Sequence, residues 1–127
     1  MSVSTAIALI IASFFPALFC FLYAAKMTGD IFDETVTGVV AGNPMPMKFR
    51  QIRFYTLSMT YALSATVCEI GTALLNLRIA QQVADADVKA LAHVFMAIAA
   101  IAAAGALAAT ALASLYVLSR FRESTGD

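Results

Sequence analysis

Residues 94–118 read VFMAIAAIAAAGALAATALASLYVL and contain no charged side chain. A helix of this length crosses the hydrocarbon core of a bilayer, which takes about 20 mostly apolar residues. Residues 3–25 and 54–77 form two further stretches of this kind without Lys or Arg, and only the second contains an acid, Glu69. The sequence therefore predicts an all-α membrane protein with three transmembrane helices.

The composition of the whole chain agrees with this class. Apolar residues make up 61% of the 127 residues and charged residues 13%, against about 45–50% and about 25% in soluble domains. The 8 basic and 8 acidic side chains cancel, so nucleic acid is not an expected partner, whereas membrane lipid is. We expect residues 1–127 to form a single transmembrane domain.

The basic residues near the ends of the spans predict the orientation. The first connection and the C-terminal tail hold six of them, and the second connection holds only Arg78 and Lys89. Because basic residues concentrate on the cytoplasmic side, we expect the N-terminus outside and the C-terminus in the cytoplasm, with a bacterial inner membrane as the setting. The six residues are Lys26, Lys48, Arg50, Arg53, Arg120 and Arg122.

The first connection contains an amphipathic pattern. Apolar residues recur at helical spacing over residues 31–40, Asp30 precedes them as a possible N-cap, and Gly42-Asn43-Pro44 follows them as a stop. This pattern predicts a short interfacial helix lying on the inner membrane surface between the first two spans. The alternative is an ordered loop that packs on neighbouring protein.

The second connection is expected to be short. No Pro or Gly occurs between Gly71 and Gln82, and Asp85 is placed to cap a third helix that begins near Ala86. Two or three linking residues would then join the second and third helices into an antiparallel hairpin.

Glu69 is the strongest candidate for a functional residue in the sequence. It lies about 22 Å along its span from Phe54, where an ionised side chain costs about 2.5–3.5 kcal/mol to insert. One interpretation is a proton or cation site, and the other is a protonated acid bonded to a neighbouring helix, with Ser13 or Thr5 as partner; a hydrogen bond to a quinone or pigment is a third. Glu69 shares a small and polar helix face with Ser58, Ala62, Ala65, Thr72 and Asn76.

The third span carries two faces of small residues, which let helix backbones approach closely in lipid. Two such faces exceed what one hairpin partner needs, so we expect a neighbour, either another membrane-protein subunit or a second copy of the chain. The first face comprises Ala99, Ala103, Ala106, Thr110 and Ala113, and the second comprises Gly105 and Ala109.

Other side chains give weaker indications of ligands. His93 is a low-ranking ligand candidate for haem, chlorophyll or a metal. Cys20 and Cys68 are expected at different depths, too far apart for a disulfide or a shared metal, so no metal site and no recognisable cofactor motif is predicted. The aromatic residues around Pro16, which include Phe14 and Phe21, more often serve packing than pigment binding.

These observations favour a non-catalytic accessory or structural subunit of a larger membrane complex, which packs through its small-residue faces. The alternative is a small homo-oligomeric transporter or channel, coupled to ions or protons, that uses Glu69. A membrane enzyme with Glu69 as general base is a third and weaker hypothesis, since the sequence offers no complete catalytic constellation.

Overall fold

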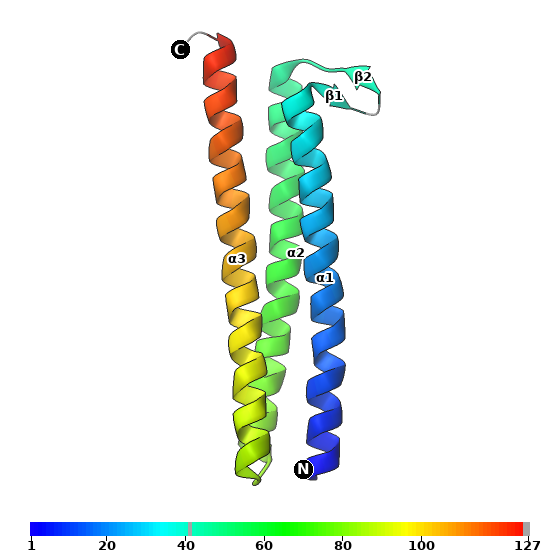
Figure 1. The fold of residues 1–127 in the computed structure, drawn as a ribbon, viewed down its shortest axis with the longest axis vertical. Helices are drawn as coiled ribbons and strands as arrows, with labels where there is room; N and C mark the ends of the chain where they lie inside the picture. Colours follow the sequence, from blue (N-terminus) through cyan, green and yellow to red (C-terminus); the bar gives the residue numbers. More distant parts are fainter. Residues whose placement is uncertain (41, 126–127) are drawn as a thin grey trace.

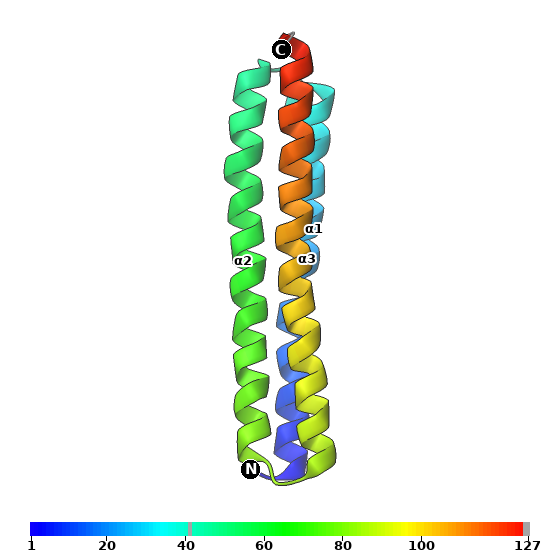
Figure 2. The same cartoon turned by 90° about the vertical axis from the view of Figure 1, so that its left-hand side faces the viewer.

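The structure is a computed structural model that describes the backbone of residues 1–40 and 42–125 and the side chains of residues 1–40 and 42–122. The fold consists of three helices, α1 (Val3–Thr37), α2 (Met47–Gln82) and α3 (Ala86–Thr125). They stand side by side, and α2 runs antiparallel to the other two (Figures 1 and 2). All three are long and apolar enough to cross a membrane, which confirms the predicted all-α membrane fold. At 35 residues α1 is about 52 Å long and exceeds a hydrocarbon core of about 30 Å.

The prediction of a separate interfacial helix over residues 31–40 is wrong. Residues 31–37 continue α1, Asp30 lies inside that helix, and α1 ends at Thr37, followed by Gly38 as its C-cap with a left-handed φ of 85°. The physical reason is that the apolar face of this segment packs on protein, because Ile31 clusters with Phe54 of α2 and Val117 of α3. A segment with such a partner gains more by extending the bundle than by turning onto the lipid surface.

A short hairpin joins α1 to α2 in place of that helix. Strand β1 (Val39–Val40) pairs antiparallel with β2 (Asn43–Pro44), so the Gly42-Asn43-Pro44 stretch forms part of a hairpin and does not end a helix. Figure 1 shows this hairpin projecting sideways at the end of the bundle that also holds the C-terminus.

Two arginines of α2 fasten the last turn of α1. The Arg50 guanidinium donates a hydrogen bond of 2.6 Å to the carbonyl oxygen of Thr35, and Arg53 forms an ion pair of 2.5 Å with Glu34. Carbonyl groups at the end of a helix have no intrahelical partner, so Arg50 satisfies one of them. These contacts hold the C-terminal end of α1 against the N-terminal end of α2.

The connection between α2 and α3 follows the prediction. Helix α2 ends at Gln82 and α3 begins at Ala86. The Asp85 carboxylate accepts hydrogen bonds of 3.0 Å from the backbone N–H groups of Asp87 and Val88. The expected cap and the tight antiparallel hairpin are therefore confirmed.

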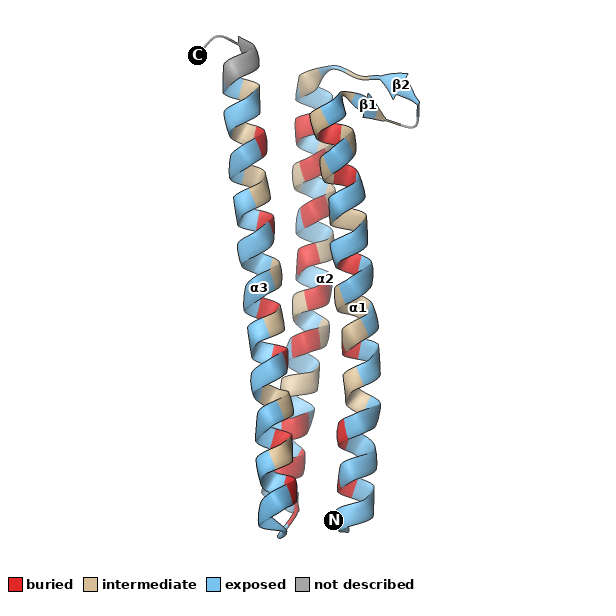
Figure 3. Cartoon of the chain, in the orientation of Figure 1, coloured by how far each residue is buried: buried red, intermediate tan, exposed pale blue. Residues whose placement is uncertain are grey.

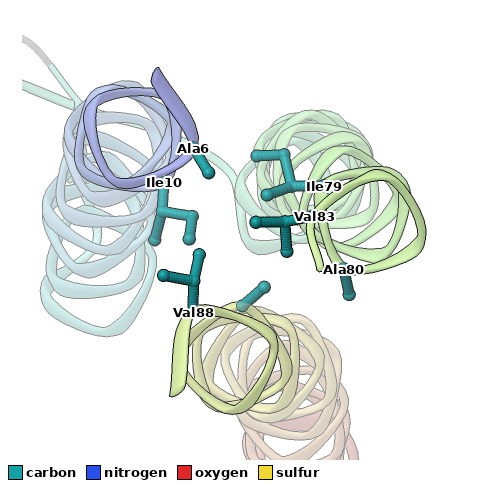
Figure 4. Packing of buried hydrophobic residues seen from close by; sticks show 7 residues of the cluster. Ala6, Ile10, Ile79, Ala80, Val83 and Val88 are labelled. Atoms are coloured by element: carbon teal, nitrogen blue, oxygen red, sulfur yellow. The ribbon is translucent and has the colours of Figure 1, made fainter. Parts of the chain in front are cut away.

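The core is a narrow seam between the helices. Figure 3 shows the buried positions facing the bundle axis and the exposed positions facing outward. Near the N-terminus, all three helices contribute to one apolar cluster (Figure 4), whose residues are Ala6, Ile10, Ile79, Ala80, Val83, Val88 and Ala92. Helix α3 packs far more extensively on α2 than on α1, so the α1–α3 side of the bundle is its weakest seam.

Candidate functional site

The small and polar face of α2 points into the bundle and forms the centre of the candidate site. Its members are buried, with Thr72 only partly so: Ser58, Ala62, Ala65, Glu69, Thr72 and Asn76. The 4-3 spacing of these positions keeps them on one side of a straight helix. Helix α2 therefore presents Ser58, Glu69 and Asn76 to the inside of the bundle, whereas many of its larger apolar residues, such as Leu63, Val67 and Leu74, are exposed.

A polar contact between α1 and α2 lies next to Glu69. The Asn76 amide nitrogen Nδ2 donates to the Ser13 hydroxyl at 3.2 Å and to the Thr72 carbonyl at 2.8 Å. Ser13 in turn donates to the carbonyl of Ile10 at 2.8 Å. The Asn76 oxygen Oδ1 is buried and has no hydrogen-bond partner among the described residues. This contact uses Ser13, which was an expected partner of Glu69.

Glu69 itself is buried without a partner. The residue is 4% exposed, and its carboxyl group forms neither a hydrogen bond nor an ion pair with the side chains described, those of residues 1–40 and 42–122. Thr5, the other partner expected from the sequence, accepts a hydrogen bond from Ser2 at the start of α1. A buried carboxyl group that has no protein partner is rare, since burying such a group is unfavourable without compensation.

Glu69 lines a pocket of about 250 Å³ between the three helices. The Phe14 and Phe95 rings, which meet edge to face with centroids 5.5 Å apart, and the Phe21 ring give this pocket an aromatic lining. Phe95 did not stand out in the sequence, because its position opposite Phe14 depends on how α3 is rotated against α1. The remaining lining residues are Ala17, Leu18, Thr72, Ile98, Ala99 and Ala102.

The two cysteines lie together, contrary to the expectation from the sequence. The sulfur atoms of Cys20 and Cys68 are 3.1 Å apart, and both residues are free thiols. The predicted depths were wrong because they were counted from span ends at Ala25 and Phe54, whereas α1 continues to Thr37 and α2 begins at Met47. With these longer helices, Cys20 and Cys68 fall at similar levels.

The two small-residue faces of α3 have different surroundings. On the first face Ala99, Ala103 and Thr110 are buried, with Ala106 and Ala113 partly so, whereas Gly105 and Ala109 are exposed on the second. A groove of about 270 Å³ separates this half of α3 from α1. A second groove, of about 640 Å³, lies between α3 and α2. Both grooves have almost entirely apolar linings.

His93, the other ligand candidate from the sequence, is remote from this site. His93 is exposed near the start of α3, and its Nδ1 lies 2.8 Å from the Lys89 carbonyl oxygen. The described residues contain no group of three or more His, Cys, Asp or Glu side chains that could hold a metal ion.

Comparison with known proteins finds no matching family model, no matching curated protein and no matching solved structure.

Proposed function

We propose that the protein is a non-catalytic accessory subunit of a larger membrane complex. The observation that carries this proposal is the pair of apolar grooves, of about 270 and 640 Å³, on either side of the C-terminal half of α3. Small residues beside such grooves, here Gly105 and Ala109, allow a further helix to approach the backbone closely. The partner is a transmembrane helix of another membrane-protein subunit.

Substitutions on α3 test this docking role. Ala109→Leu places a bulky side chain in the groove between α1 and α3, which Ala109 lines, whereas Ala108→Leu adds the same bulk at an exposed position that lines neither groove. After extraction from native membranes in a mild detergent, the wild type and Ala108→Leu should retain a stoichiometric partner protein that Ala109→Leu loses. Purification of the wild type without any stoichiometric partner would contradict the proposal.

A second function is supported by Glu69. A buried carboxyl group without a partner, beside a pocket at membrane depth, suits a homo-oligomeric transporter or channel that moves protons or other ions. Replacing Glu69 with Gln keeps the shape of the side chain and removes its charge. Flux through proteoliposomes should then fall to the level of empty liposomes, and undiminished flux would reject this role.

We further propose a bacterial inner membrane, with the N-terminus outside and the C-terminus in the cytoplasm. Six basic residues lie in the half of the bundle toward the α1–α2 hairpin and the C-terminus, with Lys26 well inside α1 and the other five closer to that end, and the opposite end carries Arg78 and Lys89. This asymmetry supports the orientation, because basic residues are retained on the cytoplasmic side. Reporter fusions at the C-terminus and in the α2–α3 turn should report opposite sides.

A further inference from the structure

We propose that the pocket beside Glu69 binds a small lipophilic organic cation, with the carboxylate of Glu69 as its counter-ion. This inference goes beyond docking to a partner subunit and requires no transport. It rests on two observations that the helix packing alone does not explain. The carboxyl group is buried without a protein partner, and the space that it lines is empty of polar groups other than Thr72.

The chemistry of the lining selects a cation. In a surrounding of low dielectric constant a carboxylate attracts a positive charge far more strongly than in water. Aromatic rings add to this attraction, since the negative face of a ring binds ammonium groups, and Phe14, Phe21 and Phe95 all line the pocket. An anion would be repelled by Glu69, and a neutral apolar molecule would leave the carboxyl group without a partner.

The same lining argues for an organic rather than an inorganic cation. Hard metal ions take six or more oxygen ligands or retain water in their place. Among the described residues, the pocket offers only the Glu69 carboxyl group and the Thr72 hydroxyl group as polar side chains, which is too few oxygen ligands for such an ion. A quaternary or primary ammonium group bearing an apolar body needs only one counter-charge and an apolar wall.

Size and access narrow the ligand class further. The pocket holds about 250 Å³, slightly less than the roughly 300–1,000 Å³ of drug-sized sites, so a single ring with a small ammonium head is the appropriate scale. Most of the lining comes from α1 and α3, the two helices that pack least on one another. A lipophilic cation can therefore enter from the bilayer between these helices.

The test uses benzyltrimethylammonium and the full chain in nanodiscs of zwitterionic lipid, with binding measured by equilibrium dialysis of the labelled cation. The wild type should bind it saturably, and Glu69→Gln should weaken binding roughly tenfold or more. Glu34→Gln is the matched control, because Glu34 is an acid outside the pocket that pairs with Arg53, and it should bind as the wild type does. Phe95→Leu should weaken binding about threefold through the loss of one ring.

A competition on the wild type needs no variant to fold. Neopentylbenzene has nearly the same shape as benzyltrimethylammonium and no charge, so it should fail to displace the cation. If unlabelled benzyltrimethylammonium and neopentylbenzene displaced the labelled cation equally well, the pocket would select apolar shape alone, and the proposal would be overturned. Equal affinity of the wild type and a Glu69→Gln protein with unchanged circular dichroism would overturn it too, as would the absence of saturable binding. None of these results bears on the docking of α3, which Ala109→Leu tests separately.

Discussion

Cys20 and Cys68 provide the most direct measure of how individual residues of α1 and α2 are aligned. Their sulfur atoms lie 3.1 Å apart, close enough for a disulfide to form without moving either helix far. Diamide accepts two electrons and two protons from a pair of thiols, so its addition to the protein in detergent should join Cys20 to Cys68 within one chain. Labelling with a maleimide polymer in SDS should then show both thiols of the monomer blocked.

The Cys20→Ser variant is the control for this experiment. It leaves Cys68 without its neighbour, so diamide should leave the Cys68 thiol of the monomer reactive. If the wild type instead keeps both thiols reactive, or forms only dimers linked between chains, then the alignment of α1 on α2 described here is wrong. The sequence could not predict this pairing, because it depends on where each helix begins and ends outside the membrane.

Glu69 shows how far sequence reasoning reaches at the scale of one residue. The pattern of small and polar neighbours such as Ser58 and Asn76 can be read from the sequence, and the structure buries these positions. The absence of a partner for the carboxyl group cannot be read from it. That absence follows from the rotation of α1, which brings Ser13 to Asn76, and from that of α3, which brings Phe95 to the pocket.

At the scale of elements, the connection from α1 to α2 depends on Gly38. Its φ of 85° is left-handed, and a Cβ atom there would lie 2.9 Å from Nη1 of Arg50, which caps the Thr35 carbonyl. Gly38→Ala should therefore lower the free energy of unfolding by about 1–2 kcal/mol, from backbone strain and the displaced Arg50. The change is measurable by unfolding in mixed micelles with increasing SDS.

Gly29 provides a comparison of opposite sign. It lies within α1, and a Cβ atom there would meet nothing within 4 Å. Gly29→Ala should raise the free energy of unfolding by about 0.5–1 kcal/mol, because Ala favours the helix over the unfolded chain. If Gly38→Ala were as stable as the wild type in the same assay, residue 38 would not need its left-handed backbone, and the prediction for Gly38 would be contradicted.

The segment 31–37 shows why an element can be misassigned even when its pattern is right. An apolar stripe suits a lipid surface and a helical neighbour equally. Residues distant in the sequence decide between the lipid surface and a helical neighbour, because Phe54 and Val117 supply the surface that Ile31 contacts. The α2–α3 hairpin could be predicted because its signals, a long apolar run and the Asp85 cap, are local.

For the whole molecule, three helices in lipid gain little from the hydrophobic effect and must be held by close packing. The described residues form such packing at both ends of the bundle, around Ile10 near the N-terminus and around Phe54 at the other end. The pocket beside Glu69 lies between these clusters, whereas the grooves beside α3 extend to the level of the Phe54 cluster, whose neighbours Tyr55 and Ala113 line them. The two proposed interactions therefore fall at different levels of the bundle, ligand binding in its middle and docking along the C-terminal half of α3.

The cluster near the N-terminus should therefore carry a large share of the stability of the bundle. Ile10 of α1 is 0% exposed and packs in the cluster that α2 and α3 share, whereas the adjacent Ile11 is 48% exposed. Ile10→Ala should lower the free energy of unfolding in mixed micelles by about 2 kcal/mol, because the cavity that it leaves removes contacts to both other helices. Ile11→Ala removes the same atoms from a surface that lipid or detergent covers, so its effect should stay within about 0.5 kcal/mol. Equal losses for the two variants would show that α1 is held by its hairpin to α2 alone and not by the three-helix cluster.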